Sequence, residues 1–114
     1  MAYAVLLLNI LLLVSGQIVW KMGLEQQGGI HLSNFLSVLF SPLILLGILF
    51  YGLATGLWFI VLSRLPLSLA YPLQSLAYAI GIVAAWYFFG ESVPLNRWIG
   101  VAVIVIGAAI IAAK

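Results

Sequence analysis

Four polar side chains lie on one face of a segment that is otherwise strongly hydrophobic. They are Tyr71, Gln74, Ser75 and Tyr78. Their spacing of i, i+3, i+4 and i+7 places them on the same side of an α-helix. Such a face can line a cavity that holds a polar substrate. It can equally bond to adjacent helices, because a polar group inside a membrane must find a partner.

A stripe of small residues runs beside that polar face. Ala77, Gly81 and Ala85 recur at every fourth position. Small residues at this spacing let two membrane helices approach closely. We therefore expect the polar face to point toward a cavity and the small stripe to contact a neighbouring helix.

A ladder of residues at intervals of four, most of them polar, runs through the first hydrophobic segment. Its members are Asn9, Leu13, Gln17 and Lys21. Lys21 continues the line of the interior polar groups, and Arg97 is predicted on the same side of the membrane. Two cations beside a polar vestibule suit an anionic headgroup, since Arg matches phosphate with a planar fork and Lys supplies a point charge. The alternative is an ordinary wetted surface with a snorkelling lysine.

The elements that must carry these faces follow from composition and length. Of 114 residues, 67% are hydrophobic and 5% are charged. A soluble domain this small could not bury so much apolar surface. Each crossing of a bilayer needs roughly 20 helical residues. The sequence therefore predicts an all-α integral membrane protein, a single four-helix membrane domain over residues 1–114 with spans of about 3–22, 43–63, 67–89 and 95–113.

Local signals predict how these spans begin, bend and pack. We expect Gly23 and then Gly28-Gly29 to end the first span. Gly52 and Gly56 form a G-x-x-x-G pattern that favours close helix packing. The tight turn 64–66 predicts that the second and third spans are antiparallel neighbours. Pro72 cannot donate a backbone hydrogen bond, so we expect it to bend the third span.

The residue inventory excludes several classes of function. The chain has no cysteine, one histidine and only two acids, Glu25 and Glu91. These are too few for a convincing metal cage, and four scattered cations make no nucleic-acid footprint. No nucleophile stands with a base and an orienting group. We therefore predict no catalytic site, metal, cofactor or nucleic-acid partner, and thus no enzyme.

Charge does not decide how the chain inserts into the membrane. Four spans place both termini and the turn at Arg64 on one side, together with Lys114. Lys21 and Arg97 fall on the other side. The positive-inside rule counts such residues near the span ends, and two against two gives no preference. This balance permits insertion in both orientations. The first segment lacks a basic n-region and an A-x-A-like site, so we expect a retained span.

Three motifs together resemble the small multidrug resistance fold of the drug/metabolite transporter superfamily. They are S-G-Q-x-x-x-K closing the first span, L-P-x-x-x-A-Y-P-x-x-S opening the third, and G-E-S-V-P-L-N-R-W before the fourth. Within that fold, the chain resembles the aminoarabinose-phosphoundecaprenol flippase subunits and related lipid-linked-sugar translocases. The resemblance covers nearly the whole chain. It carries over to Ser15, Gly16, Gln17, Lys21, Pro66, Ala70, Tyr71, Pro72, Ser75, Glu91, Trp98 and Gly100.

One departure from the fold's drug exporters is informative. Those exporters carry a glutamate in the first span on which proton and drug compete, and aligning Gly16 and Lys21 puts Leu13 there. Leucine binds neither a proton nor a cation. This departure therefore favours a lipid translocase over an exporter that exchanges drug for protons. The resemblance also implies a dimer of identical or closely related chains. We expect the fourth span, rich in Gly and Ala, to contribute to that interface.

These observations together predict a flippase subunit for a polyisoprenyl-phosphate-linked sugar in the bacterial inner membrane. Its phosphate would meet Lys21 and Arg97. Its sugar would meet polar residues along the cavity, and its tail would stay in lipid. The predicted substrate-binding residues are Gln17, Lys21, Tyr71, Gln74, Ser75, Tyr78, Glu91 and Arg97. The alternative is a small multidrug resistance-like exporter of cationic or hydrophobic small molecules.

Overall fold

The computed structural model describes residues 1–113, and its regular structure there is entirely helical. Four stretches are long and apolar enough to cross a membrane, the third of which is made by two helices in succession. The predicted all-α, four-helix membrane architecture is thereby confirmed. The helices are α1 (Ala2–Gln26), α2 (Phe35–Leu39), α3 (Pro42–Arg64), α4 (Leu67–Gln74), α5 (Leu76–Phe89) and α6 (Leu95–Ala112).

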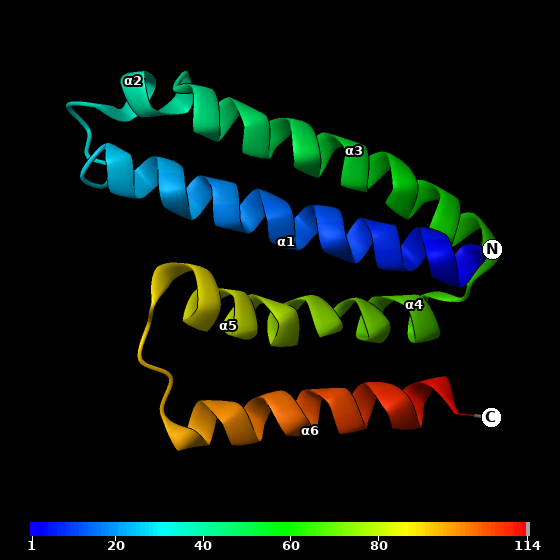
Figure 1. The fold of residues 1–114 in the computed structure, drawn as a ribbon. Coiled ribbons are helices and arrows are strands. Elements are labelled where there is room, and N and C mark those ends of the chain that lie inside the picture. Colours follow the sequence, from blue (N-terminus) through cyan, green and yellow to red (C-terminus); the bar gives the residue numbers. More distant parts are fainter. Residues whose placement is uncertain (114) are drawn as a thin grey trace.

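The four spans lie side by side in the order α3, α1, α4 with α5, and α6 (Figure 1). The molecule is accordingly flat, with extents of 51 × 36 × 21 Å. The expectation that the second and third spans are neighbours is wrong for most of their length, because α1 lies between them. α3 and α4 meet only near the turn that joins them. A short turn fixes where two helices meet, but side-chain packing decides which helices stay together.

The contact between α1 and α3 depends on three glycines. A Cβ atom at Gly16 would lie 2.7 Å from the ring of Tyr51, and one at Gly47 would collide with the indole of Trp20. Gly23, expected to end α1, is instead buried inside the helix against the start of α3. Because Gly16 and Gly47 have no side chain, the rings of Tyr51 and Trp20 pack directly against the backbone of the opposite helix.

The G-x-x-x-G pattern of α3 does not pack within this chain. A Cβ atom at Gly52 or Gly56 would meet nothing within 4 Å. The fully buried residue between them is Ala54, on another face of the helix. This pattern therefore makes no helix contact within the chain. α1 itself ends beyond Gly23, where Gly28 and Gly29 adopt φ values of +70° and +94°.

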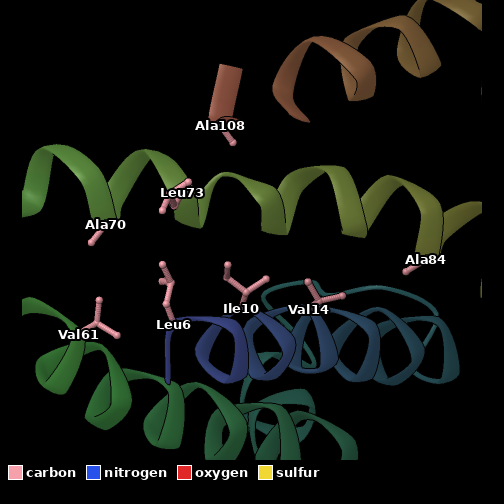
Figure 2. Close-up of a cluster of buried hydrophobic side chains, with 8 residues drawn as sticks. All are labelled: Leu6, Ile10, Val14, Val61, Ala70, Leu73, Ala84 and Ala108. Carbon is pink, nitrogen blue, oxygen red and sulfur yellow. The ribbon is translucent and has the colours of Figure 1, made fainter. Parts of the chain in front are cut away.

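The core lies along the seam between α1 and α4 with α5. Figure 2 shows Leu6, Ile10 and Val14 pointing from α1 toward that seam. The cluster also contains Val61 of α3, Ala70, Leu73, Ala84 and Ala108. Three of its eight buried members are alanines, which leave little side-chain bulk between the helices at those positions. Ala108 is the one buried residue of α6 among those described, so this helix is the least enclosed span.

The regular helix of the third span is interrupted, three residues after Pro72. α4 ends at Gln74 and α5 begins at Leu76, with Ser75 as the joint. The Pro72 carbonyl accepts hydrogen bonds from both the backbone N–H, at 3.0 Å, and the hydroxyl of Ser75. These bonds tighten the last turn of α4 before α5 begins.

Candidate substrate groove

A groove of about 1190 Å³ runs along α1 between α3 on one side and α4 with α5 on the other. We call it the substrate groove. α1 forms its floor, because that helix lies between the two walls (Figure 1). Its polar and aromatic lining residues are Asn9, Gln17, Lys21, Tyr51, Thr55, Trp58, Tyr71, Gln74, Ser75, Tyr78, Phe89 and Glu91.

The charged residues of the lining are Lys21 and Glu91. Lys21 lies toward the end of α1 and Glu91 follows α5, on the side of the α1–α2 and α5–α6 connections (Figure 1). The Lys21 ammonium is 3.8 Å from the Glu25 carboxylate one turn later, and both side chains are about half exposed. An ion pair this open to solvent contributes little stability. An anionic ligand can therefore displace Glu25 at small cost.

Next to the charged end, an aromatic pair fixes the wall formed by α3. The rings of Trp20 and Tyr51 stack with centroids 4.4 Å apart. Trp20 Nε1 donates to the Ile44 carbonyl at 3.0 Å, which holds the indole in place. Gln17 Nε2 donates to the Tyr51 hydroxyl, so the amide and the phenol line the groove together. These contacts give this part of the groove a defined shape.

The middle of the groove is uncharged and hydrogen-bonded. Asn9 is almost fully buried and donates to the Ala54 carbonyl at 2.7 Å. Its own oxygen accepts a hydrogen bond from Gln74 Nε2 at 3.0 Å. This connection joins α1, α3 and α4 below the groove. Gln74 therefore has a structural partner as well as a position in the lining.

Trp58 and Tyr71 face each other at the end near the α3–α4 turn. Their ring centroids are 6.3 Å apart, within the range of a tilted aromatic contact. Tyr71 and Tyr78 remain largely exposed, so their rings and hydroxyls are accessible from the groove. The groove thus changes along its length from a charged end, through an uncharged polar middle, to an aromatic end.

The predicted site residues are brought together with one exception. Gln17, Lys21 and Glu91 line the groove with the polar face of α4 and α5. Arg97, in the first turn of α6, is exposed and does not contribute to this lining. The side chain of Leu13 does line the groove, where the drug exporters have their glutamate. Whether these residues bind a substrate stays a prediction.

The stripe of small residues makes only part of the helix contact expected of it. Ala77, Gly81 and Ala85 all line the groove, and a Cβ atom at Gly81 would meet nothing within 4 Å. The expected packing is made by Ala77, which contacts the core cluster, and not by Gly81. Small side chains here instead leave space for the groove.

The sequence reasoning missed the contribution of α3. Tyr51, Thr55 and Trp58 line the groove from that helix. They are spaced at i, i+4 and i+7, the same type of signal as the polar face of the third span. Counting Tyr, Thr and Trp of this segment as polar candidates would have found them. Asn9 was placed on the ladder of α1, but its bond to Gln74 could not be read from spacing.

Comparison with known proteins agrees with this architecture. Residues 1–113 match the EamA-like transporter family. Two relatives are each named probable 4-amino-4-deoxy-L-arabinose-phosphoundecaprenol flippase subunit ArnE. The one from Pectobacterium atrosepticum is 36% identical over 107 residues, which make up 94% of each chain. The one from Pseudomonas fluorescens is 35% identical over 111 residues, 97% of this chain and 96% of the relative.

No solved structure matches the chain. The sequence matches nevertheless run over nearly its whole length, and the four apolar helices are those expected of a membrane transporter. Because both lines of observation agree, this protein is a multi-pass inner-membrane member of the EamA-like transporter family.

Proposed function

We propose that this protein is a subunit of a flippase that carries a polyisoprenyl-phosphate-linked sugar across the inner membrane. The relatives named as flippase subunits align over more than nine-tenths of both chains. The observation that carries the proposal is the groove itself, which joins a charged end that contains Lys21 to an uncharged polar middle. A lipid-linked sugar has the same order of groups, with a phosphate next to a ring of hydroxyls.

In this proposal, each part of the lipid occupies a matching environment. The phosphate binds Lys21 in place of Glu25. The sugar lies along Gln17, Tyr71, Gln74, Ser75 and Tyr78, and Glu91 stands beside the charged end. The polyisoprenyl tail stays in lipid outside the groove. The polar lining replaces water during the crossing, which otherwise costs several kcal/mol for each unpaired polar group. The process is transport without covalent change.

The direct test is the identity of the bound lipid. We expect lipid extracts of the gently purified protein to contain a polyisoprenyl phosphate or its sugar conjugate, detected by mass spectrometry. Purified protein should also bind added undecaprenyl phosphate. A preparation that contains ordinary phospholipids alone, and does not bind undecaprenyl phosphate, would contradict the proposal.

The second candidate is a small multidrug resistance-like exporter of cationic or hydrophobic molecules. Such an exporter needs an acid within the membrane to exchange protons for drug. The groove has Leu13 at that place, and Glu91 is the one carboxylate in its lining. The geometry therefore favours the lipid translocase.

Energy coupling separates the two candidates. Because the groove has no carboxylate within a span, we expect downhill lipid flipping in proteoliposomes to proceed without an imposed pH gradient. The flipping rates measured with and without the gradient should agree within about twofold. A strict need for the gradient, abolished by Glu91→Gln, would instead show that the acid beside the charged end couples proton movement to transport.

As a flippase subunit, the protein needs a partner, and we propose a homodimer or a heterodimer with a related small subunit. α6 is the most exposed span, and Cβ atoms at Gly100 and Gly107 would meet open space. These glycines leave room for a neighbouring helix. We expect Gly107→Leu to weaken association by about 1–3 kcal/mol if a partner helix packs there.

Crosslinking yields in membranes measure this association. Gly56→Leu is the matched control, because it adds the same side chain to an equally open position on α3. The expected order is a lower yield for Gly107→Leu and an unchanged yield for Gly56→Leu. The reverse order would move the interface from α6 to α3, and unchanged yields with Leu at both Gly100 and Gly107 would remove α6 from it.

A further inference from the structure

Two linked hydrogen bonds beneath the groove form a short chain across three helices. It begins at the Ala54 carbonyl of α3, which accepts from Asn9 Nδ2 at 2.7 Å. Asn9 Oδ1 in turn accepts from Gln74 Nε2 of α4 at 3.0 Å. Asn9 is only 1% exposed, so water cannot readily replace either bond.

The chemistry of the groups decides which of them donates in each bond of this hydrogen-bond chain. A backbone carbonyl only accepts, so Asn9 must turn its NH₂ group toward Ala54. The amide oxygen of Asn9 then faces Gln74 and also only accepts. Gln74 must therefore turn its own NH₂ group toward Asn9. Gln17 differs, because its partner is the Tyr51 hydroxyl, which can both donate and accept.

The hydrogen-bond chain leaves the amide oxygen of Gln74 available to accept a hydrogen bond from a ligand in the groove. Two neighbouring hydroxyls also use their proton in a hydrogen bond to the protein and keep their lone pairs. Ser75 donates its proton to the Pro72 carbonyl, and Thr55 donates its proton to the Tyr51 carbonyl at 2.8 Å. Each hydroxyl has one proton, so the lone pairs of both oxygens remain. All three residues line the groove, and each can offer it an acceptor.

We infer that the middle of the groove is an acceptor site for hydrogen-bond donors of the headgroup, and that Asn9 is the positioning residue that orients Gln74 within it. This inference rests on the proposed flippase function. It adds which part of the headgroup lies in which part of the groove. A phosphate needs donors and is unfavourable beside acceptors, so it stays at Lys21. Sugar hydroxyls or a protonated sugar amine supply donors and lie in the middle.

The test compares binding of three purified lipids to the folded protein. The probes are undecaprenyl phosphate, its L-arabinose conjugate and its 4-amino-4-deoxy-L-arabinose conjugate. The quantity measured is the ratio of each conjugate's affinity to that of undecaprenyl phosphate. For the parent protein we expect at least one conjugate to bind more tightly. A gain shared by both conjugates identifies hydroxyls as the donors, and a gain confined to the amino conjugate identifies the ammonium.

Asn9→Leu and Gln74→Met should each lower the ratio about three- to tenfold, the effect of a neutral hydrogen bond. The double variant should lower it no further, because both changes remove the same contact. Binding of undecaprenyl phosphate itself should stay the same. If Asn9→Leu does not fold, Asn9→Ser carries the same expectation, because its side chain is too short to reach Gln74. Ser63→Ala, outside the groove, is the control.

A purely structural role for Asn9 would weaken all lipids equally and leave the ratio unchanged. That result, or an unchanged ratio in Gln74→Met, would overturn the inference while the flippase proposal stands. If the parent protein binds neither undecaprenyl phosphate nor its conjugates, the proposed function fails, and this inference fails with it.

Discussion

Replacing Lys21 by Met should lower the affinity of the purified protein for undecaprenyl phosphate about tenfold. A hydrogen bond to a charged group contributes roughly 1.5–3 kcal/mol, and the half-exposed position of the ammonium favours the lower end of that range. Met keeps a stem of similar length, so the helix surface should remain covered. The proposed phosphate contact is lost while the groove keeps its shape.

Two further cations act as controls for this experiment. Arg64→Met removes the same charge at the opposite end of the spans and should leave binding unchanged. Arg97→Gln removes a cation on the same side as Lys21 but outside the groove lining, so a smaller loss is expected. Equal binding by Lys21→Met and the parent would show that Lys21 is a snorkelling anchor. An equal loss in Arg97→Gln, not additive with that of Lys21→Met, would restore Arg97 to the phosphate site.

Gly47→Ala should destabilise the fold by about 1–3 kcal/mol, the usual cost of inserting a methyl group into a filled space. The new Cβ atom would overlap the indole of Trp20. That indole cannot move freely, because it stacks on Tyr51 and donates to the Ile44 carbonyl. We expect a lower unfolding temperature in detergent and an altered tryptophan fluorescence spectrum.

Gly52→Ala provides the matched comparison on the same helix. Its Cβ atom would meet open space, and alanine is favoured over glycine within a helix by roughly 1 kcal/mol. This variant should therefore be as stable as the parent or slightly more so. The explanation of the α1–α3 contact would be wrong if both variants unfolded at the same temperature.

The sequence predicted the spans and one wall of the groove because both depend on local patterns. Hydrophobic length marks each crossing, and the spacing of Tyr71, Gln74 and Tyr78 marks a face regardless of what lies opposite. The neighbours of each helix depend on fit between distant residues. The closest approaches occur at Gly16 and Gly47, where a large aromatic ring covers each glycine, whereas the G-x-x-x-G pattern has no such ring beside it.

The same distinction explains the remaining differences. Arg97 could be assigned to a side of the membrane from the number of spans, but its distance from the groove depends on the path of the connection at 90–94. The break at Ser75 depends on the hydroxyl that binds the Pro72 carbonyl, which proline alone does not specify. The spacing of residues in the sequence thus predicted which helix faces are polar. Three-dimensional packing decided which of these faces lie next to one another.

The position of α1 between the two walls has a consequence for biogenesis. The floor of the groove and its first wall both come from residues 1–64, and their contacts include the Trp20–Tyr51 stack and the Asn9–Ala54 bond. A nascent chain emerges with its N-terminal part first. This helical hairpin can therefore form before the second wall has left the ribosome. The order of synthesis is then also the order in which the groove is assembled, and α4 and α5 close it by docking onto an existing surface.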